Sequence, residues 1–67
     1  MRKYGMLRER IQKVFTTQQA FAVAMGKNTV SISAKLNGKV DWTSTEIEKA
    51  CVLLDISMDE MPNYFFY

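Results

Sequence analysis

The sequence predicts a compact, all-α bundle of four to five short helices in a single domain that spans residues 1–67. Apolar side chains recur three or four residues apart in several stretches of the chain, which is the spacing of an amphipathic helix. Threonine, asparagine and serine stand where helices begin, and glycine stands where two of them end. No alternation of apolar and polar residues is long enough for a strand, and a chain of 67 residues has room for only one core.

The first two predicted helices cover residues 4–14 and 17–25. The first is amphipathic because four apolar side chains fall on one side of it, namely Tyr4, Leu7, Ile11 and Val14. The second begins at Thr17, whose hydroxyl can accept a hydrogen bond from an amide of the next turn. It ends before Gly26, because glycine adopts the left-handed conformation that closes a helix more easily than other residues do.

Three further helices are predicted. The third covers residues 29–37, between Asn28 as its N-cap and a stop signal at Asn37-Gly38. The fourth covers residues 44–54, begins with the capping box Thr43-Ser44-Thr45-Glu46, and brings four residues to one face, namely Ile47, Ala50, Cys51 and Leu54. A fifth helix, over residues 58–64, is short because Pro62 follows its start too closely for a long helix.

The composition excludes several classes of protein. A single cysteine, Cys51, cannot form an internal disulfide, and the absence of histidine removes the usual zinc ligands and the imidazole base. No paired acids, glycine-rich phosphate loop or cluster of metal ligands is recognisable, so we expect neither an enzyme nor a bound cofactor or metal. No apolar run approaches the roughly 20 residues that a membrane-spanning helix needs, so no membrane association is expected.

Charge is distributed unevenly along the chain. Residues 1–39 hold eight basic residues and one acidic residue, for a net charge of +7, whereas residues 40–67 hold one basic and six acidic residues, for −5. Clustered lysines and arginines gain affinity for nucleic acids because they release counterions from phosphates. The first half therefore favours a polyanionic partner, although solvated lysines and arginines on an ordinary surface would give the same count.

Residues 17–39 are the most informative stretch, because they predict two short helices that cross at a tight turn. Its key residues are the run Gln18-x-x-Phe21-Ala22-x-x-Met25-Gly26, then Ile32, then Leu36-Asn37-Gly38-Lys39. In this pattern the chain resembles the helix-turn-helix domains of phage repressors and Cro proteins, especially the Cro-like regulators of Gram-positive phages and prophages. The resemblance implies a lambda-repressor-like fold and a transcriptional regulator that binds an operator in double-stranded DNA. Such a protein would act in the cytoplasm of a bacterial host cell, in the nucleoid when bound.

The third helix would carry most of the DNA contacts. If Ile32 and Leu36 point inward, then Val30 and Ala34 point outward, and the resemblance places these two with Thr29 against base edges and Gln18 against a phosphate. Because Val30 and Ala34 offer only apolar contacts, hydrogen-bonded reading of bases would depend on short polar side chains, while lysines would bind phosphates. The full predicted DNA-binding set is Gln18, Lys27, Asn28, Thr29, Val30, Ser31, Ser33, Ala34, Lys35, Asn37 and Lys39.

A second hypothesis uses the same fold differently. The apolar outward face at Val30 and Ala34, or the aromatic end of the chain, could capture a phage repressor protein, so that the chain acts as an antirepressor or modulator. The aromatic end consists of Tyr64, Phe65, Phe66 and Tyr67, which is more apolar area than a terminus usually exposes. These rings either fold back on the first helix or pair with a second copy, and we favour the homodimer.

Overall fold

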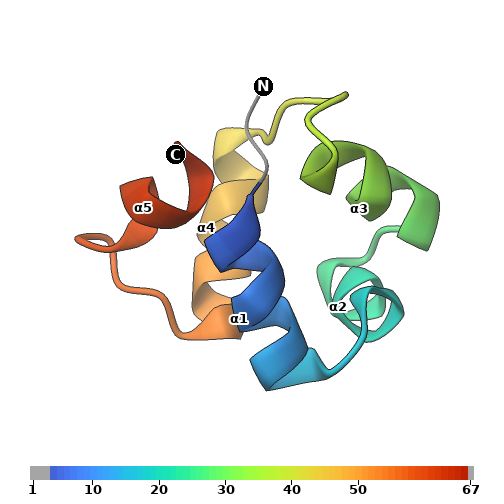
Figure 1. Cartoon of the computed structure of the whole chain (residues 1–67), viewed down its shortest axis with the longest axis horizontal. Coiled ribbons are helices and arrows are strands. Elements are labelled where there is room, and N and C mark those ends of the chain that lie inside the picture. Colours follow the sequence, from blue (N-terminus) through green and yellow to red (C-terminus); the bar gives the residue numbers. More distant parts are fainter. Residues whose placement is uncertain (1–3, 67) are drawn as a thin grey trace.

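The computed structural model describes residues 4–66 and confirms the all-α fold class. Its helices are α1 (Gly5–Phe15), α2 (Gln18–Met25), α3 (Thr29–Leu36), α4 (Ser44–Leu54) and α5 (Met61–Phe65). Figure 1 shows α1 and α4 together in the middle, with α2 and α3 on one side of them and α5 on the other. Within residues 4–66 there is no strand, and no helix there is long and apolar enough to cross a membrane.

Side-chain caps define where three of these helices begin. The Thr17 hydroxyl accepts a hydrogen bond from the backbone N–H of Ala20 at 3.1 Å, and the Asn28 side chain accepts one from Ser31 at 2.8 Å. At the start of α4 the bonds are reciprocal, because Thr43 accepts from the Glu46 backbone while the Glu46 carboxylate accepts from the Thr43 backbone. The predicted starts of these helices are therefore correct to within one residue.

The fifth helix differs most from its prediction. It begins at Met61 instead of residue 58, and residues 58–60 form a turn in which the Ser57 hydroxyl accepts from the Glu60 backbone. The physical reason is Pro62, which has no N–H to donate and therefore fits the first turn of a helix better than its interior. The other helices differ from their predicted ranges by no more than one residue at either end.

The helices enclose a single apolar core. The turn from α2 to α3 is tight because Gly26 takes a left-handed conformation, with φ of 73°, while the backbone N–H of Lys27 donates to the carbonyl of Ala22. This turn lets Phe21 and Ile32 meet in the interior. The buried apolar residues are Tyr4, Leu7, Ile11, Phe21, Ala22, Met25, Ile32, Leu36, Ala50, Cys51, Leu54, Ile56, Tyr64 and Phe65.

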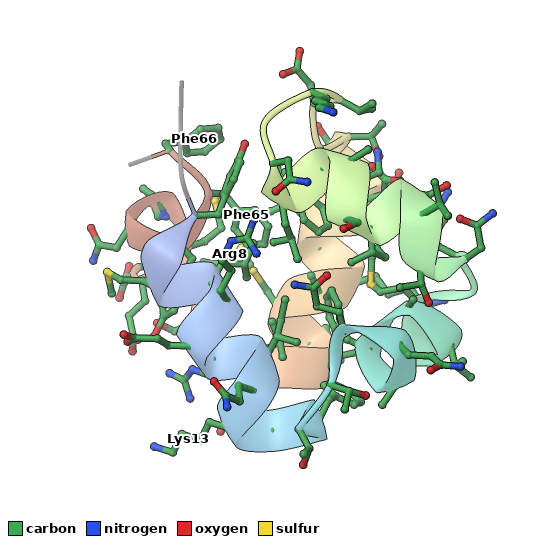
Figure 2. The ribbon with its side chains drawn as sticks, turned by 45° about the vertical axis from the view of Figure 1, so that its right-hand side comes forward. Arg8, Lys13, Phe65 and Phe66 are labelled. Carbon is green, nitrogen blue, oxygen red and sulfur yellow. The ribbon has the colours of Figure 1, made fainter. Side chains whose placement is uncertain are left out.

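The aromatic end of the chain belongs to this core, so Tyr64 and Phe65 are buried within the chain and are not exposed for the dimer contact that was expected of them. Phe65 packs its ring against Trp42 at 5.3 Å between centroids, and the Tyr64 hydroxyl accepts a hydrogen bond from Arg10 at 3.0 Å. A core this small gains more from covering these rings itself than from leaving them for a partner. Phe66 is half exposed beyond Phe65 (Figure 2), and Tyr67 lies outside the described residues.

Candidate interaction surface around α3

Most of the residues that were predicted to touch DNA lie at the surface, on α3 and the segments beside it. Six of them are exposed, namely Lys27, Asn28, Thr29, Val30, Asn37 and Lys39, and four are partly buried, namely Gln18, Ser31, Ser33 and Ala34. Val30 is 78% exposed, as expected from a side chain that points directly away from Ile32 and Leu36. The outward direction of the third helix was thus predicted correctly.

Lys35 is the exception, because it is buried and paired with groups of its own chain. Its side-chain ammonium lies 3.0 Å from the Glu46 carboxylate and donates a hydrogen bond to the backbone carbonyl of Asp41 at 3.1 Å. The same ammonium lies 5.9 Å from the centre of the Trp42 ring. The loop between α3 and α4 covers this lysine, so the prediction that Lys35 binds a phosphate at the surface is corrected.

Glu46 joins the start of α4 to the α2–α3 pair. Its carboxylate lies 3.3 Å from the Lys27 ammonium as well as 3.0 Å from that of Lys35. Burial by itself raises the pKa of Glu46, but the hydrogen bonds donated by the Thr43 backbone, Lys35 and Lys27 outweigh this and lower the pKa to about 2. Glu46 is therefore ionised at neutral pH and neutralises part of the positive charge that the sequence assigns to this face.

Arg8 binds the C-terminal end of α3. Its guanidinium donates to the Leu36 carbonyl at 3.0 Å and to the Asn37 side-chain oxygen at 2.8 Å, and Figure 2 shows it reaching from α1 toward α3. A cation at a helix C-terminus satisfies carbonyls that have no partner within the helix. Asn37 is thus held by the fold, and only the basic character of the first half gave any sequence signal for Arg8.

A shallow groove of about 290 Å³ runs along the outward side of α3. The groove is lined by Lys27, Val30, Ser31, Ala34 and Lys35 of the predicted DNA-binding set. It is also lined by Val40 and by Glu46, which the sequence marked only as a helix cap. Gln18 lies elsewhere, in a separate hollow with Arg8 and Gln12 at the start of α2. Val40 carried no local signal, since a valine in a short loop has no periodic partner that would mark it.

Positive charge is dispersed over the described surface and is not concentrated on α3. Arg10 lies 3.9 Å from Glu60 and stacks on Tyr64, so a fourth cation of the first half, after Lys27, Lys35 and Arg8, is used within the fold. Lys13 projects from the end of α1, away from the body of the protein (Figure 2). Among residues 4–66, Lys13 and Lys39 form no ion pair.

Comparison with known proteins identifies a different family from the one that the sequence pattern resembled. A family model described as "protein of unknown function (DUF739)" matches residues 2–67. The solution structure of the modulator of repression (MOR) of the temperate bacteriophage TP901-1 from Lactococcus lactis is similar to the chain. The two are 41% identical with a TM-score of 0.86, over 96% of this chain and 86% of that one. No curated protein matches the chain.

The assignment to Cro-like helix-turn-helix repressors is therefore wrong. It depended on two short helices joined by a glycine turn, and that steric arrangement serves proteins of different function. The chain belongs to the DUF739 family, whose model covers it from residue 2 to residue 67.

Proposed function

We propose that this protein modulates phage repression by binding a phage repressor protein, and that it does not regulate by reading an operator. The similarity to the TP901-1 modulator of repression, at 41% identity over nearly the whole chain, supports this proposal. It corresponds to the antirepressor hypothesis drawn from the apolar outward face of α3. This protein and the repressor would bind each other in the cytoplasm of the bacterial host.

The observation that carries the proposal is the chemistry of α3. Specific reading of the major groove usually depends on arginine, lysine, asparagine or glutamine side chains that make paired hydrogen bonds with base edges. The outward positions of α3 hold Val30 and Ala34, and the polar side chains beside them are the short ones of Thr29, Ser31 and Ser33. Such a face suits an apolar protein surface better than a set of base edges.

The cations around α3 support the same choice. Lys35 is buried, and Lys27 and Lys35 share the carboxylate of Glu46. Inside the described region, the exposed cations without an ion pair are Lys13, Lys39 and Lys49, of which Lys13 lies on α1 and Lys49 on α4. Binding to DNA gains affinity from each phosphate that a lysine or arginine neutralises, and around α3 the described region offers only Lys27 and Lys39 as exposed cations.

The experiment that tests the proposal uses the full chain, the full-length repressor from the same phage genome, and DNA from the region between their promoters. Isothermal titration calorimetry measures the binding to repressor, and fluorescence anisotropy measures the binding to DNA at about 50 and about 200 mM salt. We expect a stable heterocomplex and no operator preference over random DNA. Specific operator binding by the chain alone, without a heterocomplex, would show that the Cro-like function was right.

A further inference from the structure

We infer that the groove along α3 holds an apolar stripe of an amphipathic helix of the repressor, with acidic side chains beside that stripe. This inference depends on the proposed function, and it specifies the surface and the chemistry of the partner. It rests on the apolar side chains that line the groove and on the charges of the residues beside them.

Three apolar side chains line the groove. Val30 and Ala34 are one helical turn apart, so they lie on the same side of α3, and Val40 from the following loop lines the groove with them. Val30 is 78% exposed and Val40 is 48% exposed, whereas the small Ala34 side chain between them lets another backbone approach closely. Grooves of this kind bind helices through apolar residues spaced three and four positions apart.

The charges beside the groove determine which helix fits. Lys27, Lys35 and Glu46 form one wall, where two cations share one carboxylate, so the wall keeps a net charge of +1. Within this wall the Lys27 side chain is 42% exposed, whereas the Glu46 side chain is only 10% exposed and its charge is covered. Lys39 and Asp41 are both exposed and flank Val40 in the sequence, so this loop adds a second accessible cation together with one carboxylate.

A partner helix with aspartate or glutamate beside its apolar stripe therefore complements this rim, whereas a lysine-rich or arginine-rich helix is repelled. DNA would also contact Lys27 and Lys39. Its polar phosphates and sugars would then lie against the exposed apolar side chains of Val30 and Val40, so DNA fits this surface less well. A second copy of the chain is a rival occupant, because Val52 is 81% exposed on α4 between the acidic residues Glu48 and Asp55. The experiment must separate these three occupants.

The test compares two aspartate substitutions at exposed valines. Val30→Asp places a carboxylate in the centre of the groove, whereas Val23→Asp, at a valine that is 73% exposed on α2, does not line the groove and serves as the matched control. We expect Val30→Asp to weaken binding of the full-length repressor at least tenfold, and Val23→Asp to change it less than twofold. Val40→Asp, in the loop, repeats the test independently of α3, and circular dichroism checks that each variant is folded.

The rim is tested by Lys39→Glu, whose cost in affinity should disappear at high salt because the lysine is exposed. If the wild-type chain does not bind repressor, the proposed function and the inference both fail. If the wild type binds and both Val30→Asp and Val40→Asp bind equally well, only the groove assignment is wrong. Sedimentation of the chain alone, showing self-association that Val30→Asp abolishes, would instead identify a second copy as the occupant and overturn the inference.

Discussion

Replacing Glu46 by glutamine should destabilise the protein by a cost that depends on pH. Glutamine keeps the size of the side chain and an oxygen that can accept from the Thr43 backbone, but it removes the charge opposite Lys27 and Lys35. Lys35 is only 7% exposed, so its ammonium would stay buried without a counter-charge. Removing one partner of a buried ion pair is costly because the other charge keeps its desolvation penalty.

The size of the effect follows from the titration of Glu46. Each tenfold change in an acidity constant corresponds to about 1.4 kcal/mol. The lowering of the pKa from 4.5 to about 2 thus corresponds to ~3 kcal/mol of differential stabilisation. Because the folded pKa is below the unfolded one, this stability is fully present above pH ~4.5 and is lost as pH falls toward 2. We expect Glu46→Gln to cost ~2–3 kcal/mol at pH 7 and about half of that at pH 3.

Urea denaturation followed by circular dichroism at both pH values measures this cost. A loss of this size is a large part of the total stability of such a domain, which is roughly 3–10 kcal/mol. Because each kcal/mol shifts the melting temperature of a small domain by about 4–8 °C, it should fall by roughly 10–20 °C at neutral pH. Glu48→Gln, the same change at an exposed position of α4, is the control and should stay within about 0.5 kcal/mol of wild type. A cost for Glu46→Gln that is equal at pH 7 and pH 3 would refute the electrostatic reasoning.

Three other predictions concern the fold. Gly26→Ala should lower stability by about 1–2 kcal/mol in urea denaturation, because the left-handed φ of 73° strains any residue with a Cβ; an unchanged midpoint would contradict this. Phe65→Ala should cost roughly 3–5 kcal/mol, because it removes a buried ring from the core. Sedimentation should give the same mass as for wild type, and a change from dimer to monomer would show that Phe65 forms a dimer contact instead. Burial covers the Cys51 thiol and raises its pKa, so a thiol reagent should label it only under unfolding conditions. Rapid labelling of the native protein would contradict this and would mean that α4 opens easily.

The local signals in the sequence predicted the helices well, because each depends on a few neighbouring residues. Thr43 and Glu46 make the capping box that their spacing indicates, and Gly26 takes the conformation for which glycine is suited. The cap signal at Ser57 predicts a fifth helix from residue 58, whereas the helix begins at Met61, directly before Pro62. The serine does accept a hydrogen bond, but it stabilises a turn before the helix.

The candidate site was predicted only in part. Val30 and Ala34 were placed outward correctly, because the direction of a short helix follows from its two inward residues. Lys35 lies at the border between the two faces, about a quarter-turn from the direction of Ile32 and Leu36, so the helix alone does not decide its exposure. Its burial depends on Glu46, a residue of another helix, and on the loop that carries the Asp41 carbonyl.

The sequence by itself determined the secondary structure and the outward face of α3, because helical periodicity and caps act over a few residues. Only the tertiary structure decided how charge and aromatic area are used. It pairs Lys27 and Lys35 with Glu46, ties Arg8 to the end of α3 and encloses Phe65 against Trp42. These contacts join residues distant in the sequence, and their geometry depends on how the helices pack. The count of basic residues in the first half therefore does not by itself distinguish a DNA partner from the proposed protein partner.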